Sequence, residues 1–287
     1  MSTMSRRGFL QNSALVLGGL SLTSLVGCGG QASGGSEGSA PAAAAGAGAK
    51  LVEEGKLTCI SNMYFPPFEF MDEKTGEAKG FDIELSNAIA EHMGLTANWT
   101  SESNQSFDSL VPTIKAGGKA DIAIAGMTIT EDRKQEVNLS NPYLDSNQSL
   151  VIKKGSGETL KTLDSDEKTI AVQAGTTGAD WAKENFPKAA SAGNIKGLDD
   201  IITAMEGVST GNFNALVTDL PVASYQINEN GFDGLEIEEE IPTGEQYGIA
   251  VSKDNPQLLD DINAALEAIK QDGTMAKLQK KWFGQEL

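Results

Sequence analysis

The spacing of hydrophobic residues switches between two patterns along the chain, and this alternation predicts an α/β fold. Between Gly80 and Gly94, apolar residues recur at positions 83, 85, 89, 90 and 93, as in a helix with one buried face. Residues 120–126, ADIAIAG, are apolar almost throughout, which is typical of a strand in a parallel sheet covered on both faces. Such strands and helices continue to alternate to the C-terminus, as they do in α/β proteins.

The same patterns place the remaining elements. Both types of segment are bounded by Gly, Pro, Asn or Asp, which commonly end helices and strands. We expect the strands at 56–62, 97–102, 120–126, 168–175, 213–219 and 247–253. We expect helices at 80–94, 107–118, 176–186, 200–211 and 220–231, and a helical tail at 255–284 with a break at Gly273.

The N-terminus has the features of an export signal. Arg6 and Arg7 precede a weakly apolar run over residues 14–26, which is too short to span a membrane. The arginine pair and the Gly-Phe-Leu after it resemble a twin-arginine signal, and an ordinary secretory signal is the alternative. LVGC at residues 25–28 resembles the bacterial lipobox, in which Cys28 would be lipidated and would become the first residue of the mature protein.

The segment after Cys28 cannot build a hydrophobic core. Residues 29–50 are rich in Gly, Ala and Ser and predict a flexible tether. We therefore expect a signal peptide at 1–27, a lipidated cysteine and tether at 28–55, and a folded body from residue 56. Cys59 lies in an apolar run of that body, where a buried, unpaired thiol is expected.

Charge and composition exclude several classes of function. The formal net charge is −18 over 287 residues and no basic stripe occurs, so we expect no nucleic-acid partner. The chain contains no run of about 20 apolar residues, so we expect no membrane-spanning helix. The single histidine, His92, has no metal-ligand partner at helical spacing, and no Gly-x-Ser-x-Gly motif occurs. We expect no catalytic residue, no metal and no cofactor, and we expect a monomer.

Arg133 stands close behind one of the expected strands. Thr130 can cap a helix that follows it, and the strand end at Gly126 is the edge where open α/β sheets bind ligands. Backbone N–H groups at Gly126 and Thr128, the Thr128 hydroxyl and the planar Arg133 fork would suit a carboxylate. The alternative is a surface arginine paired with nearby acids, and spacing alone does not decide between the two. Those acids are Glu131, Asp132 and Glu136.

A second strand end carries the sequence QAGTT. The strand ends at Gln173, Gly175 permits a tight turn, and free N–H groups around Thr176 and Thr177 could hold an anion at the start of a helix. No Gly-Lys-Ser/Thr follows, so a phosphate-binding loop is not expected. Taken alone, a plain strand-to-helix turn is the simpler interpretation.

Asp219 ends a third apolar strand at the same edge of the predicted sheet. Its carboxylate could accept hydrogen bonds from an ammonium group. The alternative is an N-cap for the next helix, which has Pro221 in its first turn. Spacing alone favours the cap.

Aromatic residues gather in the loops that follow these strands. Tyr64, Phe65 and Phe68 lie in a proline-containing loop after the first strand, and Phe107 opens a later helix. Aromatic rings at a sheet edge could enclose an apolar side-chain stem. Ordinary core packing is the alternative, and we assign Phe68 and Phe70 to the core.

Residues 56–287 resemble the extracellular solute-binding proteins of bacterial amino-acid ABC transporters, the polar amino-acid family. The resemblance is carried, in order, by PPFEF, GFDIEL, the long stretch from DSLVPTIK to LSNPY, QAGTT, VTDLPVASY, YGIAVSK and LQKKWFG. It implies a two-lobed periplasmic-binding-protein-like fold with a ligand cleft between the lobes. Lobe 1 would comprise 56–146 and 246–287 and lobe 2 would comprise 147–245, with hinge crossings near 145–149 and 243–247.

The resemblance also implies the roles of individual residues. Arg133 matches the arginine that grips the α-carboxylate of the ligand, and Thr177 matches a second-lobe donor to the same group. Asp219 matches the acid that holds the α-ammonium. Gly126 and Thr128 match the donors beside Arg133, Phe65 and Phe107 match an aromatic pair around the ligand side chain, and Asn62 and Gln173 stand where relatives carry Asp and Lys.

These matches imply a lipid-anchored receptor that delivers an amino acid to an ABC permease. Asn62 in place of Asp removes a negative charge from the side-chain pocket and so favours a neutral polar ligand such as glutamine over lysine or arginine. A dehydratase of the same fold and an amino-acid sensor domain are the alternatives. The dehydratase would need an acid/base pair in the pocket, and an acid opposite an ammonium would serve it no purpose.

Overall fold

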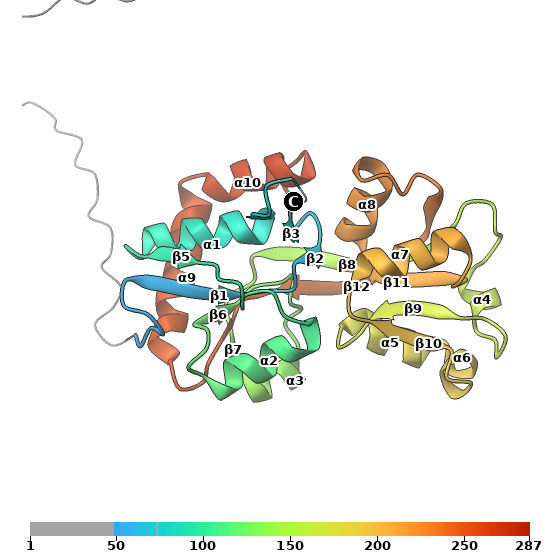
Figure 1. Cartoon of the computed structure of the whole chain (residues 1–287), viewed down its shortest axis with the longest axis horizontal. Helices are drawn as coiled ribbons and strands as arrows, with labels where there is room; N and C mark the ends of the chain where they lie inside the picture. Colours follow the sequence, from blue (N-terminus) through green and yellow to red (C-terminus); the bar gives the residue numbers. More distant parts are fainter. Residues whose placement is uncertain (1–48, 73) are drawn as a thin grey trace, which may run out of the picture. The chain divides into compact units, whose positions relative to one another are not determined.

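The computed structural model describes residues 49–72 and 74–287, which form two lobes around two five-stranded sheets (Figure 1). The predicted signal peptide, Cys28 and the tether up to residue 48 lie outside the described residues. The strands are β1 (Lys56–Ile60), β2 (Tyr64–Phe65), β3 (Glu69–Met71), β4 (Ala78–Lys79), β5 (Thr96–Asn98), β6 (Ile122–Ala123), β7 (Asn138–Leu139), β8 (Leu144–Lys153), β9 (Ile170–Gln173), β10 (Ile195–Leu198), β11 (Ala215–Asp219), β12 (Leu235–Tyr247) and β13 (Ala250–Val251). The helices are α1 (Phe81–His92), α2 (Phe107–Ala116), α3 (Glu131–Glu136), α4 (Leu160–Leu163), α5 (Thr177–Asn185), α6 (Pro187–Ser191), α7 (Ile201–Thr210), α8 (Leu220–Glu229), α9 (Pro256–Gln271) and α10 (Thr274–Phe283).

The first lobe is built on the sheet β5-β1-β6-β13-β7. Strands β5, β1 and β6 are parallel, whereas β13 runs antiparallel to both of its neighbours. Helices α1, α9 and α10 pack against one another on one side of this sheet, and α2 and α3 lie on the other side (Figure 1). Both faces are therefore covered, which explains why all residues of β1 after Lys56 are buried.

The second lobe is built on the sheet β10-β9-β11-β8-β12, and its strands divide their side chains between two cores. Val151, Ala171 and Leu216 belong to the core that includes α7, whereas their neighbours Leu150 and Val172 belong to the core that includes α5 and α6. Successive side chains of a strand point to opposite faces, so these short apolar strands serve helices on both sides.

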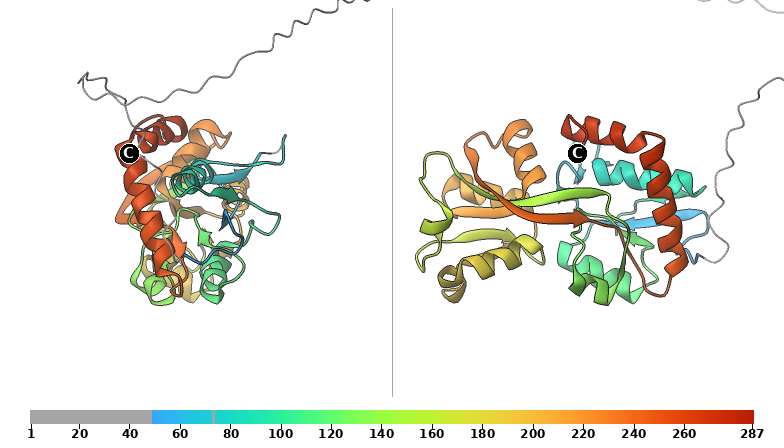
Figure 2. Two further views of the ribbon diagram at one scale, coloured as in Figure 1. Left: turned by 90° about the vertical axis from the view of Figure 1, so that its left-hand side faces the viewer. Right: turned by 180° about the vertical axis from the view of Figure 1, so that it is seen from behind.

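The chain passes between the lobes in β8 and returns in β12. These strands pair antiparallel over most of their length, with a register shift between Ile241 and Glu245, and Figure 2 shows them running through both lobes. At the first-lobe end of this ribbon, the Tyr143 N–H group donates to the Tyr247 carbonyl at 3.0 Å, and Thr128 forms a β-bridge with Tyr247. The crossing ribbon therefore ends directly against the loop that leads to α3.

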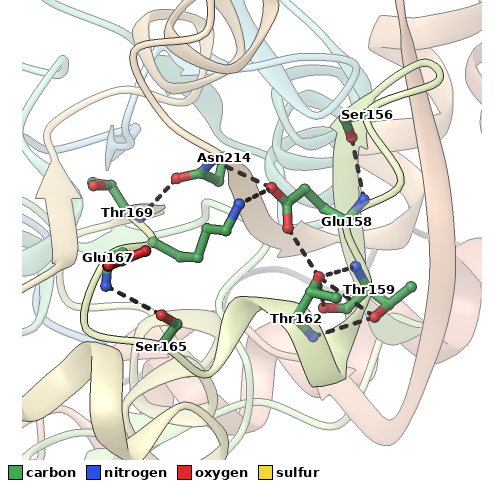
Figure 3. A network of polar contacts seen from close by, with 9 residues as sticks. Ser156, Glu158, Thr159, Thr162, Ser165, Glu167, Thr169 and Asn214 are labelled. Atoms are coloured by element: carbon green, nitrogen blue, oxygen red, sulfur yellow. Dashed lines mark hydrogen bonds and ion pairs between the residues drawn. The ribbon is translucent and has the colours of Figure 1, made fainter.

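A polar network ties the loop before β9 to the rest of the second lobe (Figure 3). The buried Glu158 carboxylate accepts from Lys168 Nζ at 2.5 Å and from Thr162 Oγ1 at 2.9 Å, and Asn214 Oδ1 accepts from the Thr169 N–H group at 2.9 Å. Burial acts to raise the pKa of Glu158, but the hydrogen bonds from Lys168 and Thr162 outweigh it and leave that pKa below its usual value.

The structure confirms the α/β alternation and the expected helices, including the break at Gly273, where the backbone is left-handed. Four expected strands are wrong in extent. The strand expected at 120–126 is Ile122–Ala123, the one at 247–253 is Ala250–Val251, the one at 97–102 is Thr96–Asn98, and the one at 168–175 is Ile170–Gln173. Ile124, Ala125 and Ile249 lie just outside these short strands but are still buried, so burial accounts for the hydrophobic pattern that extends beyond the strands. Because of β13 and β8, neither sheet is purely parallel.

Other expectations can be checked residue by residue. Cys59 is fully buried and unpaired, as expected, and burial raises the pKa of its thiol well above the usual value. Phe68 is fully buried, but the assignment of Phe70 to the core is wrong, since Phe70 is half-buried against Trp282. Within the described residues, no helix is both long and apolar enough to cross a membrane.

The end of the predicted tether lies against the first lobe. The Val52 N–H group donates to Asp121 Oδ1 at 2.8 Å, and the Lys50 N–H group donates to Asn255 Oδ1 at 3.2 Å. Leu51 packs against the core. A tether that extends to residue 55 is therefore too long, because the ordered contacts of the body begin before β1.

Candidate functional site

Arg133 reaches from the first lobe to the second. It is the third residue of α3, whose start is capped by the Thr130 hydroxyl accepting from the Arg133 N–H group at 3.2 Å. Arg133 Nη1 donates to the Thr128 carbonyl at 2.7 Å, and Nη2 donates to the Gly175 carbonyl of the second lobe at 3.1 Å. Its guanidinium carbon lies 5.3 Å from the centroid of the Phe107 ring, within the range of a cation–π contact.

The alternative interpretation of Arg133 as part of a surface ion pair is wrong. Glu131 pairs with Lys134, and Glu136 pairs with Lys115, so these acids have other partners. Burial lowers the pKa of the Arg133 guanidinium, against the opposing charges of Asp219 and Glu245. Arginine nevertheless stays charged in proteins, so this is a partly desolvated cation that joins carbonyl groups of the two lobes.

The loop between β6 and α3 forms one wall of the site. Thr128 Oγ1 lies 3.3 Å from Thr177 Oγ1, which brings together the two predicted hydroxyl donors from opposite lobes. Gly126 has a φ of 53°, and a Cβ placed there would lie 3.0 Å from the Phe65 ring. The position therefore requires glycine both for its left-handed backbone and for space.

One expectation for Gly126 is wrong. Its N–H group was expected to serve the ligand, but it donates to the buried carboxylate of Asp82 at 2.8 Å. The Gly126 N–H group thus holds this loop to Asp82 of α1. The Thr128 hydroxyl and the Arg133 guanidinium remain the predicted donors on this wall.

Asp219 ends β11 and is only 6% exposed. Its carboxylate accepts from Gln148 Nε2 at 2.8 Å and from the Tyr247 hydroxyl, and it makes no hydrogen bond to the start of α8. Asp219 therefore stands at the N-cap position of α8, but its side chain does not cap the helix. Burial and the charge of Glu245 raise the pKa of Asp219 to about 7, although Tyr247, Gln148 and Arg133 oppose the shift.

Glu245 is a site residue that the sequence did not reveal. Gln148 Nε2 donates both to Asp219 Oδ1 at 2.8 Å and to Glu245 Oε2 at 2.9 Å, and Thr128 Oγ1 lies 3.4 Å from the same Glu245 oxygen. Glu245 therefore links the two ends of the site from the crossing strand β12. Because Glu245 lies in a segment rich in glutamate, its sequence position suggests a solvated acid. Only its contacts with Gln148 and Thr128 set it apart from the other glutamates.

Asn62 and Gln173 meet across the lobes. Gln173 Nε2 donates to Asn62 Oδ1 at 2.9 Å and to the Asp199 carbonyl at 3.1 Å, and Asn62 Nδ2 donates to the Gln105 carbonyl at 2.8 Å. Both side chains are buried, and Gln173 Oε1 accepts no hydrogen bond from any group in the described part of the chain. This end of the site offers an unused, buried acceptor.

The predicted residues thus form contacts in more than one group. Arg133 contacts both Phe107 and Thr128, and Thr128 meets Thr177. Gln173 meets Asn62 separately, and Phe65 packs against Phe68 with ring centroids 5.9 Å apart. Phe65 and Phe107 make no ring contact with each other in the described residues. Residues 49–72 and 74–287 contain no cluster of three or more His, Cys, Asp or Glu side chains that could hold a metal.

Comparison with known proteins identifies the family. Residues 57–285 match the family described as bacterial extracellular solute-binding proteins, family 3. The chain belongs to this family. The arginine-binding periplasmic protein of Mannheimia haemolytica is 38% identical over 224 residues, which are 77% of this chain and 88% of the relative.

Solved structures of the family agree with the two-lobed fold. An ancestral arginine-binding protein bound to arginine is 40% identical with a TM-score of 0.72, over 80% of this chain and 98% of that one. An ancestral arginine-binding protein bound to glutamine is 40% identical with a TM-score of 0.73, over 81% of this chain and 100% of that one. The expected periplasmic-binding-protein-like fold is therefore confirmed.

Proposed function

We propose that this member of the family is an extracytoplasmic receptor that binds an amino acid between its two lobes and delivers it to an ABC permease. One observation carries the proposal. Arg133 of the first lobe and Asp219 of the second carry opposite charges that attract each other, yet the two side chains form no ion pair. Each hydrogen-bonds to other groups instead. The named relatives are binding proteins, so we propose binding rather than catalysis.

An amino acid is the ligand that satisfies both charges at once. Its carboxylate would accept from Arg133 and from the Thr128 and Thr177 hydroxyls, and its ammonium would donate to Asp219. A partly desolvated charge without a partner costs several kcal/mol, and a bridging zwitterion supplies both partners. Because the donors lie on different lobes, the ligand favours the closed arrangement over an open one.

The side-chain end of the site favours a ligand with N–H donors. Gln173 Oε1 is a buried acceptor that no donor among residues 49–72 and 74–287 contacts, and leaving it unpaired costs about 1–3 kcal/mol. A terminal amide or a guanidinium would supply the missing donor, so glutamine and arginine are the two candidates.

Two observations favour different candidates. Asn62, which is neutral and pairs with Gln173, favours the uncharged amide of glutamine. The charges around the site favour arginine instead, because Arg133 faces two acids, Asp219 and Glu245, and a cationic side chain would balance the excess. The names of the relatives support arginine, and one ancestral arginine-binding protein has been solved with glutamine bound.

A thermal-shift screen against the twenty amino acids tests the proposal. A ligand present at 100 times its Kd adds about 2.7 kcal/mol of stability, so a true ligand gives a clear shift. Calorimetry with L-arginine and L-glutamine then separates the two candidates. Lys134→Ala is the matched control for Arg133→Ala, since both residues lie in α3 and only Arg133 faces the site. The proposal is wrong if no amino acid stabilises the protein, or if Arg133→Ala binds as tightly as the Lys134→Ala control.

The membrane anchor is a separate part of the proposal. It is supported by the arginine pair, the lipobox-like LVGC and the Gly/Ala/Ser-rich segment that follows. Cys28→Ala should release the protein from membranes into the soluble fraction without changing its ligand affinity. Membrane retention of this variant would show that another segment holds the protein.

A further inference from the structure

Two carboxyl groups are buried side by side beneath the site. Glu69 of β3 and Asp82 in the first turn of α1 are both fully buried. Neither forms an ion pair with a Lys, Arg or His within the described residues. The sequence patterns that predicted the ligand-binding residues assigned no role to Glu69 or Asp82.

Hydrogen bonding shows that the pair cannot be doubly ionised. Three of its four oxygens, Glu69 Oε1 and Oε2 and Asp82 Oδ1, accept from no donor group in the described part of the chain. The nearby Ser61 hydroxyl donates to the Ile124 carbonyl at 2.6 Å and so has no hydrogen left for Glu69. An ionised carboxylate buried without donors is strongly disfavoured, so the pair must hold a proton, and a proton held between the two carboxyl groups would supply the missing donor.

Electrostatics decides which carboxyl carries this proton. Burial, followed by the charge of Asp82 and the hydrogen bond with it, raises the pKa of Glu69 well above its usual value. Burial also raises the pKa of Asp82, to about 6, but the Gly126 N–H and the Tyr143 hydroxyl oppose the shift. The single proton therefore resides on Glu69 and the single negative charge on Asp82.

The charged Asp82 carboxylate holds the turn at Gly126 in place. Asp82 Oδ2 accepts from the Gly126 N–H group at 2.8 Å and from the Tyr143 hydroxyl at 2.9 Å. The Tyr143 ring lies 6.1 Å from that of Tyr247, whose hydroxyl donates to Asp219. The acid pair thus holds the left-handed turn at Gly126, which leads to Thr128. Through Tyr143 it also lies next to Tyr247, which hydrogen-bonds to Asp219.

We propose that Glu69 and Asp82 share one proton and act as a positioning pair, which fixes the Gly126 turn for amino-acid binding only while that proton is present. This inference rests on the proposed function for its binding consequence, but the shared proton stands on its own. In the part of the chain that the structure describes, the titratable groups that face the pair are Tyr143, Tyr247 and Asp219, and none is a cation. Losing the proton would place two negative charges together with no counter-charge in contact.

Glu69→Gln tests the shared proton without removing the hydrogen bond. The amide still donates to Asp82 but cannot ionise. In the wild-type protein, Glu69 is protonated when folded and ionises on unfolding, so the unfolding equilibrium constant rises about tenfold per pH unit above pH ~4.5 from this group alone. The variant lacks this contribution. Between pH 5 and pH 7 its unfolding constant should therefore rise less steeply, by about tenfold per pH unit.

Infrared spectroscopy gives an independent measurement. The wild-type protein at pH 7 should show a protonated-carboxyl C=O stretch that disappears in Glu69→Gln. Protonated Asp219 contributes to both spectra and cancels in the difference. Glu91→Gln, at an exposed position of α1, should change neither the spectrum nor the pH slope. Equal pH slopes for wild type and Glu69→Gln, or an unchanged infrared spectrum, would overturn the shared proton.

Binding then tests positioning. Glu69→Gln should bind the amino acid found in the screen within threefold of wild type, whereas Glu69→Ala should bind at least tenfold more weakly because Asp82 loses its donor. If both variants bind equally weakly, the proton is not what positions the turn. Since the unfolding and infrared measurements use no ligand, a protein that binds no amino acid would fail the proposed function and leave the shared proton separately testable.

Discussion

Ligand binding should weaken as the pH falls below about 7, because a proton then competes with the ligand ammonium for Asp219. The pKa of this carboxyl is raised to about 7 by its burial and by the charge of Glu245. The ammonium binds the ionised carboxylate only. The free amino acid keeps its own charged carboxylate and ammonium throughout the range from pH 5 to pH 8, so the titration belongs to the protein.

The size of the effect follows from the pKa. Two pH units below it, at pH 5, only about one molecule in a hundred has Asp219 ionised, so the Kd should be about a hundredfold higher than at pH 8. This corresponds to about 3 kcal/mol. In the ligand-free protein the sign is opposite. An acid with a raised pKa costs stability as the pH rises from about 4 to about 7, so Asp219→Asn should make the unliganded protein more stable at pH 8, by up to about 4 kcal/mol.

Isothermal titration calorimetry of L-arginine and L-glutamine at pH 5, 6, 7 and 8 measures the dependence. Asp219→Asn should bind weakly at every pH, by about 3–5 kcal/mol at pH 8, and should lose the acid dependence. Asp233→Asn, which removes an exposed acid of the same lobe, should behave like wild type. A wild-type Kd that changes less than threefold between pH 8 and pH 5, or a dependence retained in Asp219→Asn, would refute this reasoning.

Three further changes probe the same site. Arg133→Lys keeps the charge but cannot reach both the Thr128 and Gly175 carbonyls and a carboxylate, so calorimetry should show at least tenfold weaker binding with an unchanged melting temperature; wild-type affinity would mean that the planar fork is not needed. Gly126→Ala forces a Cβ to 3.0 Å from Phe65 at a φ of 53°, and urea denaturation should show a loss of about 1–3 kcal/mol together with weaker binding; a neutral result would mean that the loop readily adopts another conformation. Glu245→Gln removes the like charge that raises the pKa of Asp219, so the midpoint of the pH dependence of binding should move to lower pH, and an upward shift would contradict the assignment.

Local chemistry at strand ends allowed the sequence to predict Arg133 and Asp219. Both follow apolar strands at the edge where such sheets bind ligands, and the resemblance to a family removed the ambiguity that spacing had left. The structure adds a physical reason in each case. Arg133 contacts carbonyl groups instead of its neighbouring acids, and Asp219 accepts from Gln148 and Tyr247 instead of capping α8.

Sequence reasoning missed three acids. Asp82 and Glu245 stand in segments where acids are usually solvated, and Glu69 lies between Phe68 and Phe70. A single sequence does not show which of many carboxylates is buried. Asp82 even has the pattern of a favourable acid in the first turn of a helix. Its true partner, the Gly126 N–H group, is 44 residues away and becomes apparent only when β6 and α1 are placed together.

The order of strands in the first sheet has a consequence for how the chain is made. β13, at residues 250–251, lies between β6 and β7, so these two strands remain apart until the chain has been synthesised beyond the whole second lobe. Every strand and helix of the second lobe emerges from the ribosome before β13 does, and long-range pairing of this kind is slow. The part of the protein that begins first along the chain is therefore completed last, and its sheet lacks the strand between β6 and β7 while the second lobe is being synthesised.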